Sequence, residues 1–188
     1  MRKRGQVLII VAILISVTLL LLAVAVDAGR LYIERARMKR AAQSAADAGV
    51  SVVAEEMVTL AVARQTVMAG TPTPTPPATV TPTPLLDQVQ RWLTDEDRAT
   101  LVSDPIQAKA EAAALAFAHV NGLSISDPDT LEMKLVYPQP GYAPDNPAIQ
   151  TLRVLMIVRR RATILLAGLL GQDFVDLSAE GLSEVPQR

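Results

Sequence analysis

The chain opens with a long apolar run that has no charged side chain. It covers residues 7–26, follows Arg2, Lys3 and Arg4, and ends where Asp27 begins the next segment. About 20 apolar residues at 1.5 Å rise cover roughly 30 Å, which is the thickness of the hydrocarbon core of a bilayer. The pattern predicts a basic tail at residues 1–6 and a transmembrane helix over residues 7–26.

Helical periodicity continues beyond the apolar run. Residues 27–70 are mostly good helix formers, and no proline occurs before Pro72. Apolar positions recur at spacings of three, four and seven, as in Leu31, Met38 and Ala45. This spacing predicts an amphipathic helical stalk that is continuous with the membrane helix. Its apolar face must be buried, either on the protein's own distal part or on a partner.

Small residues are repeated at four-residue spacing on the predicted helix. This small-xxx-small pattern lets another backbone approach closely. Alanine is also the best helix former, so packing on the protein's own distal domain explains the stalk residues equally well. We predict a helix-packing interface made of Ala12, Ser16, Ala25, Gly29, Ala41, Ala45 and Gly49.

A Thr/Pro-rich linker occupies residues 71–84, with the sequence TPTPTPPATVTPTP. Its six prolines lack amide donors and fix φ, which excludes both helix and sheet. As polyproline II at about 3.1 Å per residue, it would be a semi-rigid spacer of roughly 40 Å. Its threonines could carry O-glycans on an extracellular stalk.

Residues 85–188 mix helical and strand patterns. Thr94 and Asp97 resemble a capping box. Asp104 is predicted to be the capping carboxylate of the next helix, with Pro105 at its first position, and Asn121-Gly122 marks that helix's end. The mixture predicts an α+β domain with a largely antiparallel sheet. The expected helices are 85–92, one after Thr94, 104–120 and 162–171, and the expected strands are 131–135, 151–158 (central) and 175–180.

Charge is distributed unevenly along the chain. Residues 1–84 carry nine Lys/Arg against five Asp/Glu, whereas residues 85–188 carry nine against fourteen. The basic half would lie beside the membrane, where anionic headgroups attract it. The acidic distal part argues against nucleic-acid binding. The sequence has no cysteine, which excludes disulfides and thiolate metal sites.

The flanks of the apolar run predict topology. The short basic tail favours a cytoplasmic N-terminus and an extracytoplasmic C-terminal domain on a single-pass protein of the cell membrane. Asp27 and Arg30 would mark the membrane boundary, because a charge deep in hydrocarbon costs several kcal/mol. Two processing alternatives remain: signal-peptide cleavage after Ala25, and trimming between Gly5 and Gln6.

The sequence contains no recognisable catalytic, cofactor or metal pattern. The single histidine, His119, lacks ligand partners at suitable spacing. Asp95, Glu96 and Asp97 are best explained as helix-start charges, and Arg159–Arg161 as a solvated strand end. We therefore predict a non-enzymatic protein that needs no cofactor.

The N-terminal fifty residues resemble a known family. Arg4-Gly5-Gln6 before the apolar run, Asp27 to Tyr32 (DAGRLY) at its exit, and Gln43 to Gly49 (QSAADAG) on the stalk are similar to TadE/TadG-like proteins of the tight-adherence (Flp) pilus system. Pilins and many TadE-type pseudopilins place a glutamate five residues after the processed glycine. Ile10 stands there, which brings the chain closer to the unprocessed TadG-like branch.

The resemblance implies a membrane-anchored, pseudopilin-like component of a pilus assembly or secretion apparatus. Its expected partners are the lipid bilayer, other pilus-assembly membrane proteins and, as an open alternative, further copies of itself. The rival hypothesis is a membrane-tethered extracytoplasmic sensor or ligand-binding module, with the Thr/Pro tract extending its reach.

Overall fold

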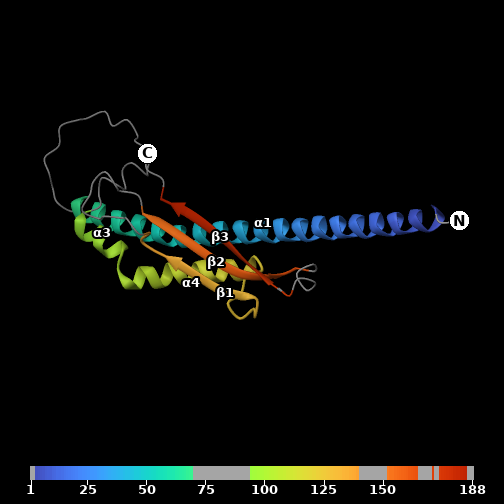
Figure 1. Cartoon of the computed structure of the whole chain (residues 1–188). Coiled ribbons are helices and arrows are strands. Elements are labelled where there is room, and N and C mark those ends of the chain that lie inside the picture. The colour runs from blue at the N-terminus through green and yellow to red at the C-terminus, as the bar shows by residue number, and fades with distance from the viewer. Residues whose placement is uncertain (1–2, 70–93, 140–151, 165–170, 172–173, 186–188) are drawn as a thin grey trace, which may run out of the picture.

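The computed structural model describes residues 3–69, 94–139, 152–164, 171 and 174–185, with side chains described for residues 7–65 of the first range. One helix, α1 (Lys3–Ala69), dominates it (Figure 1). Its 67 residues give a length of about 100 Å. The described part of the distal chain, here called the head, contains α3 (Asp95–Leu101), α4 (Asp104–Val120), β1 (Thr130–Val136), β2 (Arg153–Thr163) and β3 (Phe174–Glu184).

The three strands form one antiparallel sheet in the order β1-β2-β3. The predicted α+β class, with a long helix and an antiparallel sheet, is confirmed, and β2 is the central strand as expected. Alternate β2 residues Val154, Met156 and Val158 are fully buried, because this face of the sheet packs against helix. β3 shows the expected alternation, with exposed Asp176 and Ser178 between more buried neighbours.

The ends of α4 largely follow their sequence signals. Gly122 takes a φ of +82°, which favours glycine. The amides of Gly122 and Leu123 donate to the carbonyls of His119 and Ala118, forming the two-bond Schellman closure. The predicted capping carboxylate was wrong: Ser103 is the N-cap residue, and Asp104 lies in the first turn, where its charge still complements the helix dipole.

The C-terminal half of β2 corrects two expectations. Ala162 and Thr163, assigned to a short helix from sequence, continue the strand and pair with Val175 and Phe174 of β3. Arg159–Arg161 therefore lie within a paired strand instead of at its solvated end. Strand pairing along the whole of β3 outweighs the local helical pattern here. Ile164 and Gly171 of that predicted helix are also not helical. Its residues 165–170 and the predicted helix at 85–92 lie outside the described residues.

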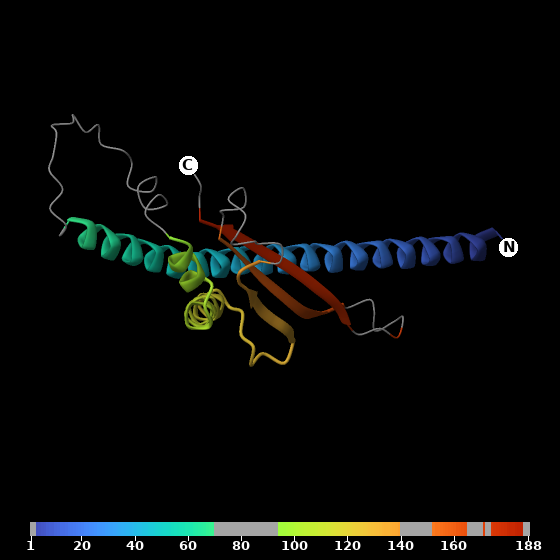
Figure 2. The same cartoon turned by 90° about the vertical axis from the view of Figure 1, so that its left-hand side faces the viewer.

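The stalk part of α1 and the head share one hydrophobic core. Met38, Ala42, Ala45, Ala46 and Val53 of α1 are fully buried, as are residues of α4 and β2. In both views α4 and the sheet lie along the C-terminal part of α1, and the N-terminal part projects alone (Figures 1 and 2). The apolar face of the stalk is therefore buried by the protein's own head.

The closest contact in this packing is between β3 and α1. A Cβ built on Gly181 would lie 2.3 Å from the carbonyl carbon and oxygen of Ala42. Beside it, the Gln43 amide donates to the carbonyl oxygen of Leu182 at 2.8 Å. Only glycine allows the strand backbone to approach the helix this closely.

The Thr/Pro linker was interpreted from the sequence as a semi-rigid spacer, and in the rival hypothesis as a tether that extends the reach of the distal part. The residues on its two sides instead contact each other: the guanidinium of Arg64, near the end of α1, lies 3.2 Å from Asp97 Oδ1 at the start of α3. The first described residues after the linker thus lie against α1.

Asp97 stabilises this junction in two ways. Thr94 and Asp97 form the predicted capping box, with hydrogen bonds in both directions, and Asp97 also accepts from Arg64. The hydrogen bond from the Thr94 amide, followed by those from Arg64 and the Thr94 hydroxyl, lowers the pKa of Asp97 despite its burial. The ionised carboxylate therefore favours the folded state.

This lowered pKa predicts an acid-sensitive contribution to stability. Because the folded state holds the proton less tightly, the contribution is fully present above the ordinary carboxyl pKa of about 4 and is lost as the pH falls through the depressed value. Asp97→Ala should lower the melting temperature at pH 7, as measured by thermal denaturation in detergent micelles. The difference in melting temperature between this variant and the unsubstituted chain should shrink below about pH 4. Glu96→Ala, at a 90% exposed side chain, is the control and should change little. A difference for Asp97→Ala that is constant with pH would contradict this account.

Candidate functional site

The apolar segment of α1 has no covering in the structure. Its large side chains from Val7 to Val26 are 46–74% exposed. Among the described residues, α1 is the one helix long and apolar enough to cross a membrane, and its most apolar window is not buried at all. A water-exposed surface of this size is unfavourable, so the segment is suited to a bilayer or to partner helices.

The predicted helix-packing residues separate into two groups. Ala41, Ala45 and Gly49 are buried within the protein's own core, and a Cβ on Gly49 would lie 3.2 Å from Val154 Cγ1 of β2. Ala12, Ser16, Ala25 and Gly29 are exposed on the bare part of α1, and a Cβ on Gly29 would meet nothing within 4 Å. The second group alone has a free surface for a partner.

Hydroxyl groups on the bare segment are compatible with hydrocarbon. Ser16 Oγ donates to the carbonyl of Ala12 at 2.9 Å, and Thr18 Oγ1 donates to that of Leu14 at 2.8 Å. These intrahelical bonds satisfy polar groups that would be costly if left unpaired in a bilayer. Gly5 and Gln6 lie in the first turns of α1, and the exposed Ile10 follows them on the same helix.

The boundary residues differ in environment. Asp27 is buried, with 6% of its surface exposed, whereas Arg30 is exposed. Arg30 and Leu31 line a cavity of about 200 Å³ together with Arg161, Ala162 and Thr163 of β2. The end of the sheet thus reaches α1 one turn after Asp27. Tyr32, which is 77% exposed, lies beside this contact.

A collar of cations surrounds the stalk just after the boundary. It consists of Arg30, Arg35, Arg37, Lys39 and Arg40, all exposed. None of these five forms an ion pair within the described part of the chain. At 100° per residue, Arg30 and Arg37 share one side of the helix while Arg35 and Lys39 lie on the opposite side. Cations on all sides fit a surrounding anionic environment better than a one-sided partner.

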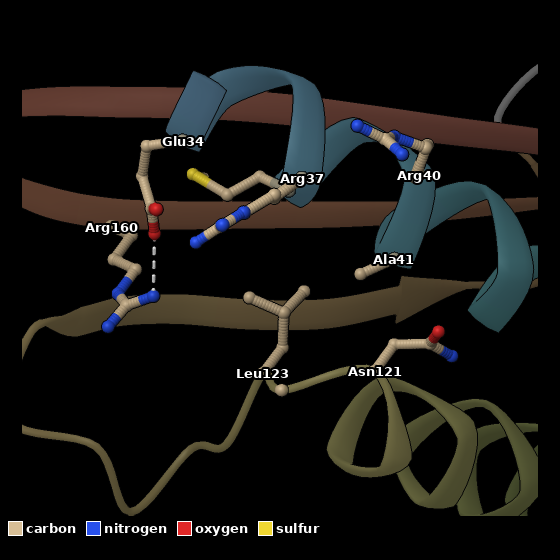
Figure 3. Close-up of a pocket in the computed structure, with 9 residues that line it drawn as sticks. Glu34, Arg37, Arg40, Ala41, Asn121, Leu123 and Arg160 are labelled. Atoms are coloured by element: carbon tan, nitrogen blue, oxygen red, sulfur yellow. Dashed lines mark hydrogen bonds and ion pairs between the residues drawn. The ribbon is translucent and has the colours of Figure 1, made fainter. Parts of the chain in front are cut away.

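Arg160 joins the head to the collar region. Its guanidinium donates to Glu34 of α1 at 2.7 Å and to Asp127, in the loop before β1, at 2.8 Å. Figure 3 shows the Glu34 contact beside a recess of about 460 Å³ whose walls include Arg37, Arg40 and Leu123. Sequence patterning had missed this bridge, because the partners are 126 and 33 residues away in the chain.

Removing Arg160 should loosen the head from α1. Arg160→Gln leaves two partly buried carboxylates without their cation, which should lower the free energy of unfolding by about 1–3 kcal/mol. Arg159→Gln is the matched control, since Arg159 is 55% exposed and its 3.5 Å pair with Glu132 should contribute below about 1 kcal/mol. Denaturant titration of both variants in micelles tests the difference, and equal losses would contradict the bridge.

Chemical groups for catalysis or metal binding are sparse in the described part of the chain. It contains no group of three or more His, Cys, Asp or Glu side chains placed to hold a metal ion. His119 is exposed near the end of α4. Asp95 and Glu96 lie in the first turn of α3, as their interpretation as helix-start charges requires.

An exposed apolar helix that continues into a helix covered by a small α+β head is the architecture of a single-pass membrane-anchored protein. Residues 5–61 match the family described as putative Flp pilus-assembly TadE/G-like. This match confirms the resemblance found in the N-terminal part of the sequence; residues 62–188 lie outside it. No curated protein and no solved structure matches the chain.

Proposed function

We propose that this protein is a membrane-anchored, pseudopilin-like component of a Tad/Flp-type pilus assembly or secretion apparatus, acting by helix packing instead of catalysis. The observation that carries the proposal is the coincidence of the TadE/G-like match with α1, whose N-terminal part is bare. The head packs on the stalk and leaves residues 7–26 exposed for contacts with lipid and partners.

The proposed topology follows the charge distribution. Residues 1–6 are cytoplasmic, residues 7–26 span the cell membrane, and the head lies outside the cytoplasm. Residues 27–70 carry the head directly at the membrane surface. Asp27 and Arg30 flank the exit of the helix from the bilayer.

The proposed partner-binding residues form two pairs on the bare part of α1. Ala12 and Ser16 are one helical turn apart, and Ala25 and Gly29 repeat the spacing near the boundary. None of these four residues belongs to the core shared with the head, so partner helices could approach both pairs closely. At 100° per residue, Ala25 and Gly29 lie about 140° around the helix from Ala12 and Ser16, so each pair would meet a different helix. The partner would be a helix of another pilus-assembly membrane protein or the α1 helix of a second copy.

The assembly role is tested in cells that lack this protein. We expect loss of surface pili, counted by electron microscopy, and recovery on expression of the unsubstituted chain. The variant Ala12→Leu with Ser16→Leu should reach the membrane at normal level but fail to restore pili, because larger side chains block close helix approach. The control, Ile13→Leu with Val17→Leu, should restore them. Unchanged pili in the cells lacking the protein would refute the role.

We further propose that the N-terminus is retained. Pilins and many TadE-type pseudopilins, which are trimmed after a glycine, have a glutamate at the position that Ile10 occupies in this chain. We therefore do not expect trimming between Gly5 and Gln6. Intact-mass measurement of the membrane-extracted protein should show a chain that includes residues 2–5. A mature chain that begins at Gln6 would contradict this.

A second candidate function is ligand binding at the recess beside Arg160. Its volume of about 460 Å³ lies within the range of small-molecule sites. Its walls carry the charges of Glu34, Arg37, Arg40 and Arg160, whereas most such sites are lined mainly by apolar groups. Saturable binding of a small dicarboxylate, lost in Arg37→Gln with Arg40→Gln, would favour a sensor over an assembly component.

A further inference from the structure

The end of the sheet formed by β2 and β3 lies at the level where α1 leaves the proposed bilayer. Thr163, the last residue of β2, lines a cavity with Leu31 of α1 and pairs with Phe174, the first residue of β3. Leu31 is five residues beyond Val26, a rise of about 7.5 Å. Each headgroup layer is roughly 5–7 Å thick, so this sheet end is at headgroup depth.

The side chains at this end suit a lipid interface. Phe174 is 51% exposed, and the guanidinium carbon of Arg161 lies 5.8 Å from the centre of its ring. Arg161 is also half-exposed, and its contact with Asp176 is long, at 3.9 Å. An aromatic ring beside a cation is a common combination at membrane interfaces, where the ring enters the apolar boundary and the cation meets phosphate.

The neighbouring surface of α1 has the same character. Arg30 is exposed and unpaired among the described residues, and Tyr32 and Ile33 are 77% and 52% exposed. The collar continues this positive surface around the helix. In contrast, the opposite end of the head carries the acidic first turn of α3, including Asp95 and Glu96. The head is therefore polarised, with its cationic and aromatic end toward the membrane.

We propose that the β2–β3 end of the sheet is a second membrane contact. It rests on the leaflet from which α1 emerges, with Phe174 at the apolar boundary and Arg30 and Arg161 on the phosphates of anionic lipids. The head then lies on the bilayer surface and fixes the rotation and depth of α1, so that the Ala12–Ser16 face has a defined direction. This inference rests on the proposed span of residues 7–26.

The test uses depth-dependent quenching on the full chain. The sequence has no cysteine, so single-cysteine variants can be labelled uniquely with an environment-sensitive fluorophore. Thr163→Cys places the label at the proposed contact and keeps Phe174. Leu182→Cys, on an exposed side chain of β3, is the matched control; its register partner Leu155 is eight residues from Thr163, or about 27 Å along the strand.

We expect headgroup-attached quenchers in vesicles containing phosphatidylglycerol to quench the label at residue 163 several-fold more than the label at residue 182. The difference should fall in Phe174→Ser, in Arg161→Gln and in vesicles of phosphatidylcholine alone. It should persist in Arg159→Gln, the matched control on the same strand. Equal quenching at residues 163 and 182 would overturn the proposal. It would also be overturned if quenching at residue 163 stayed the same in Arg161→Gln and in vesicles of phosphatidylcholine alone.

A third label distinguishes this inference from the anchor itself. Leu19→Cys lies in the middle of the proposed span and should be quenched by quenchers on the acyl chains. If Leu19 is quenched but Thr163 is not, the second contact is wrong and the anchor stands. If neither is quenched, the proposed span fails and the second contact fails with it.

Discussion

Gly181→Ala is expected to displace the head from α1. The new Cβ would lie 2.3 Å from backbone atoms of Ala42, and backbone cannot rotate away as a side-chain tip can. Overpacking against side chains costs about 1–3 kcal/mol, and a clash with helix backbone should exceed about 3 kcal/mol. Denaturant unfolding in micelles, followed by circular dichroism, would measure the loss.

Gly29→Ala provides the matched control. Gly29 lies on the same helix that Gly181 contacts, but a Cβ there meets nothing within 4 Å. Alanine is favoured over glycine within a helix by about 1 kcal/mol, so this substitution should be neutral or slightly stabilising. If Gly181→Ala and Gly29→Ala change the free energy of unfolding by the same amount, β3 does not lie against Ala42.

Met38→Ala should be the second most damaging change, although Met38 belongs to the helix that also forms the anchor. Its side chain is fully buried between α1 and the head. Truncating a buried methionine leaves a cavity and costs about 2–5 kcal/mol. The head should therefore lose stability through a residue more than fifty positions before its first helix, α3. If the stalk and the head unfolded separately, the substitution would leave the stability of the head unchanged.

Val58→Ala is the control for this cavity. Val58 lies on the same helix but is 40% exposed, and alanine has the higher helix propensity. Its effect should stay within about 1 kcal/mol. Equal losses for Met38→Ala and Val58→Ala, measured by the same unfolding assay, would argue against a shared core.

Local signals in the sequence identified most of the individual elements. The capping box at Thr94 and Asp97 and the glycine closure at Gly122 depend on neighbouring residues only, so the sequence contains all the information they need. Ala162 and Thr163 were assigned wrongly, because the strand there depends on pairing with Phe174 and Val175 of a later segment. The pattern of apolar and polar residues within one segment does not show which distant segment will pair with it.

The arrangement of the elements was less accessible from sequence. The stripe through Ala41, Ala45 and Gly49 indicated a buried face, but periodicity does not specify which surface covers it. The structure shows that the head covers it, which leaves two exposed pairs, Ala12 with Ser16 and Ala25 with Gly29, as the proposed partner-binding residues. The Arg160 bridge escaped detection for the same reason, since its two carboxylates come from distant segments.

The polarity of the molecule follows from this arrangement. One end of α1 is bare and apolar, its middle carries the cationic collar, and its far end is tied to α3 through Arg64 and Asp97. A head that is clamped to the anchor in this way transmits any force or rotation on the head directly to the membrane helix. This coupling supports the proposed assembly role, since a flexible tether would lack it.

Zero-length crosslinking tests the clamped arrangement most directly. The Nζ atom of Lys109 on α4 lies 3.7 Å from a carboxylate oxygen of Glu56 on α1, so a carbodiimide should join them by an amide bond. In membranes containing a mixture of isotope-labelled and unlabelled full-length protein, mass spectrometry should detect this crosslink within single chains, and Glu56→Gln should abolish it. A Glu56–Lys109 crosslink found only between labelled and unlabelled chains would contradict the account, because the head would then cover a neighbour's stalk instead of its own.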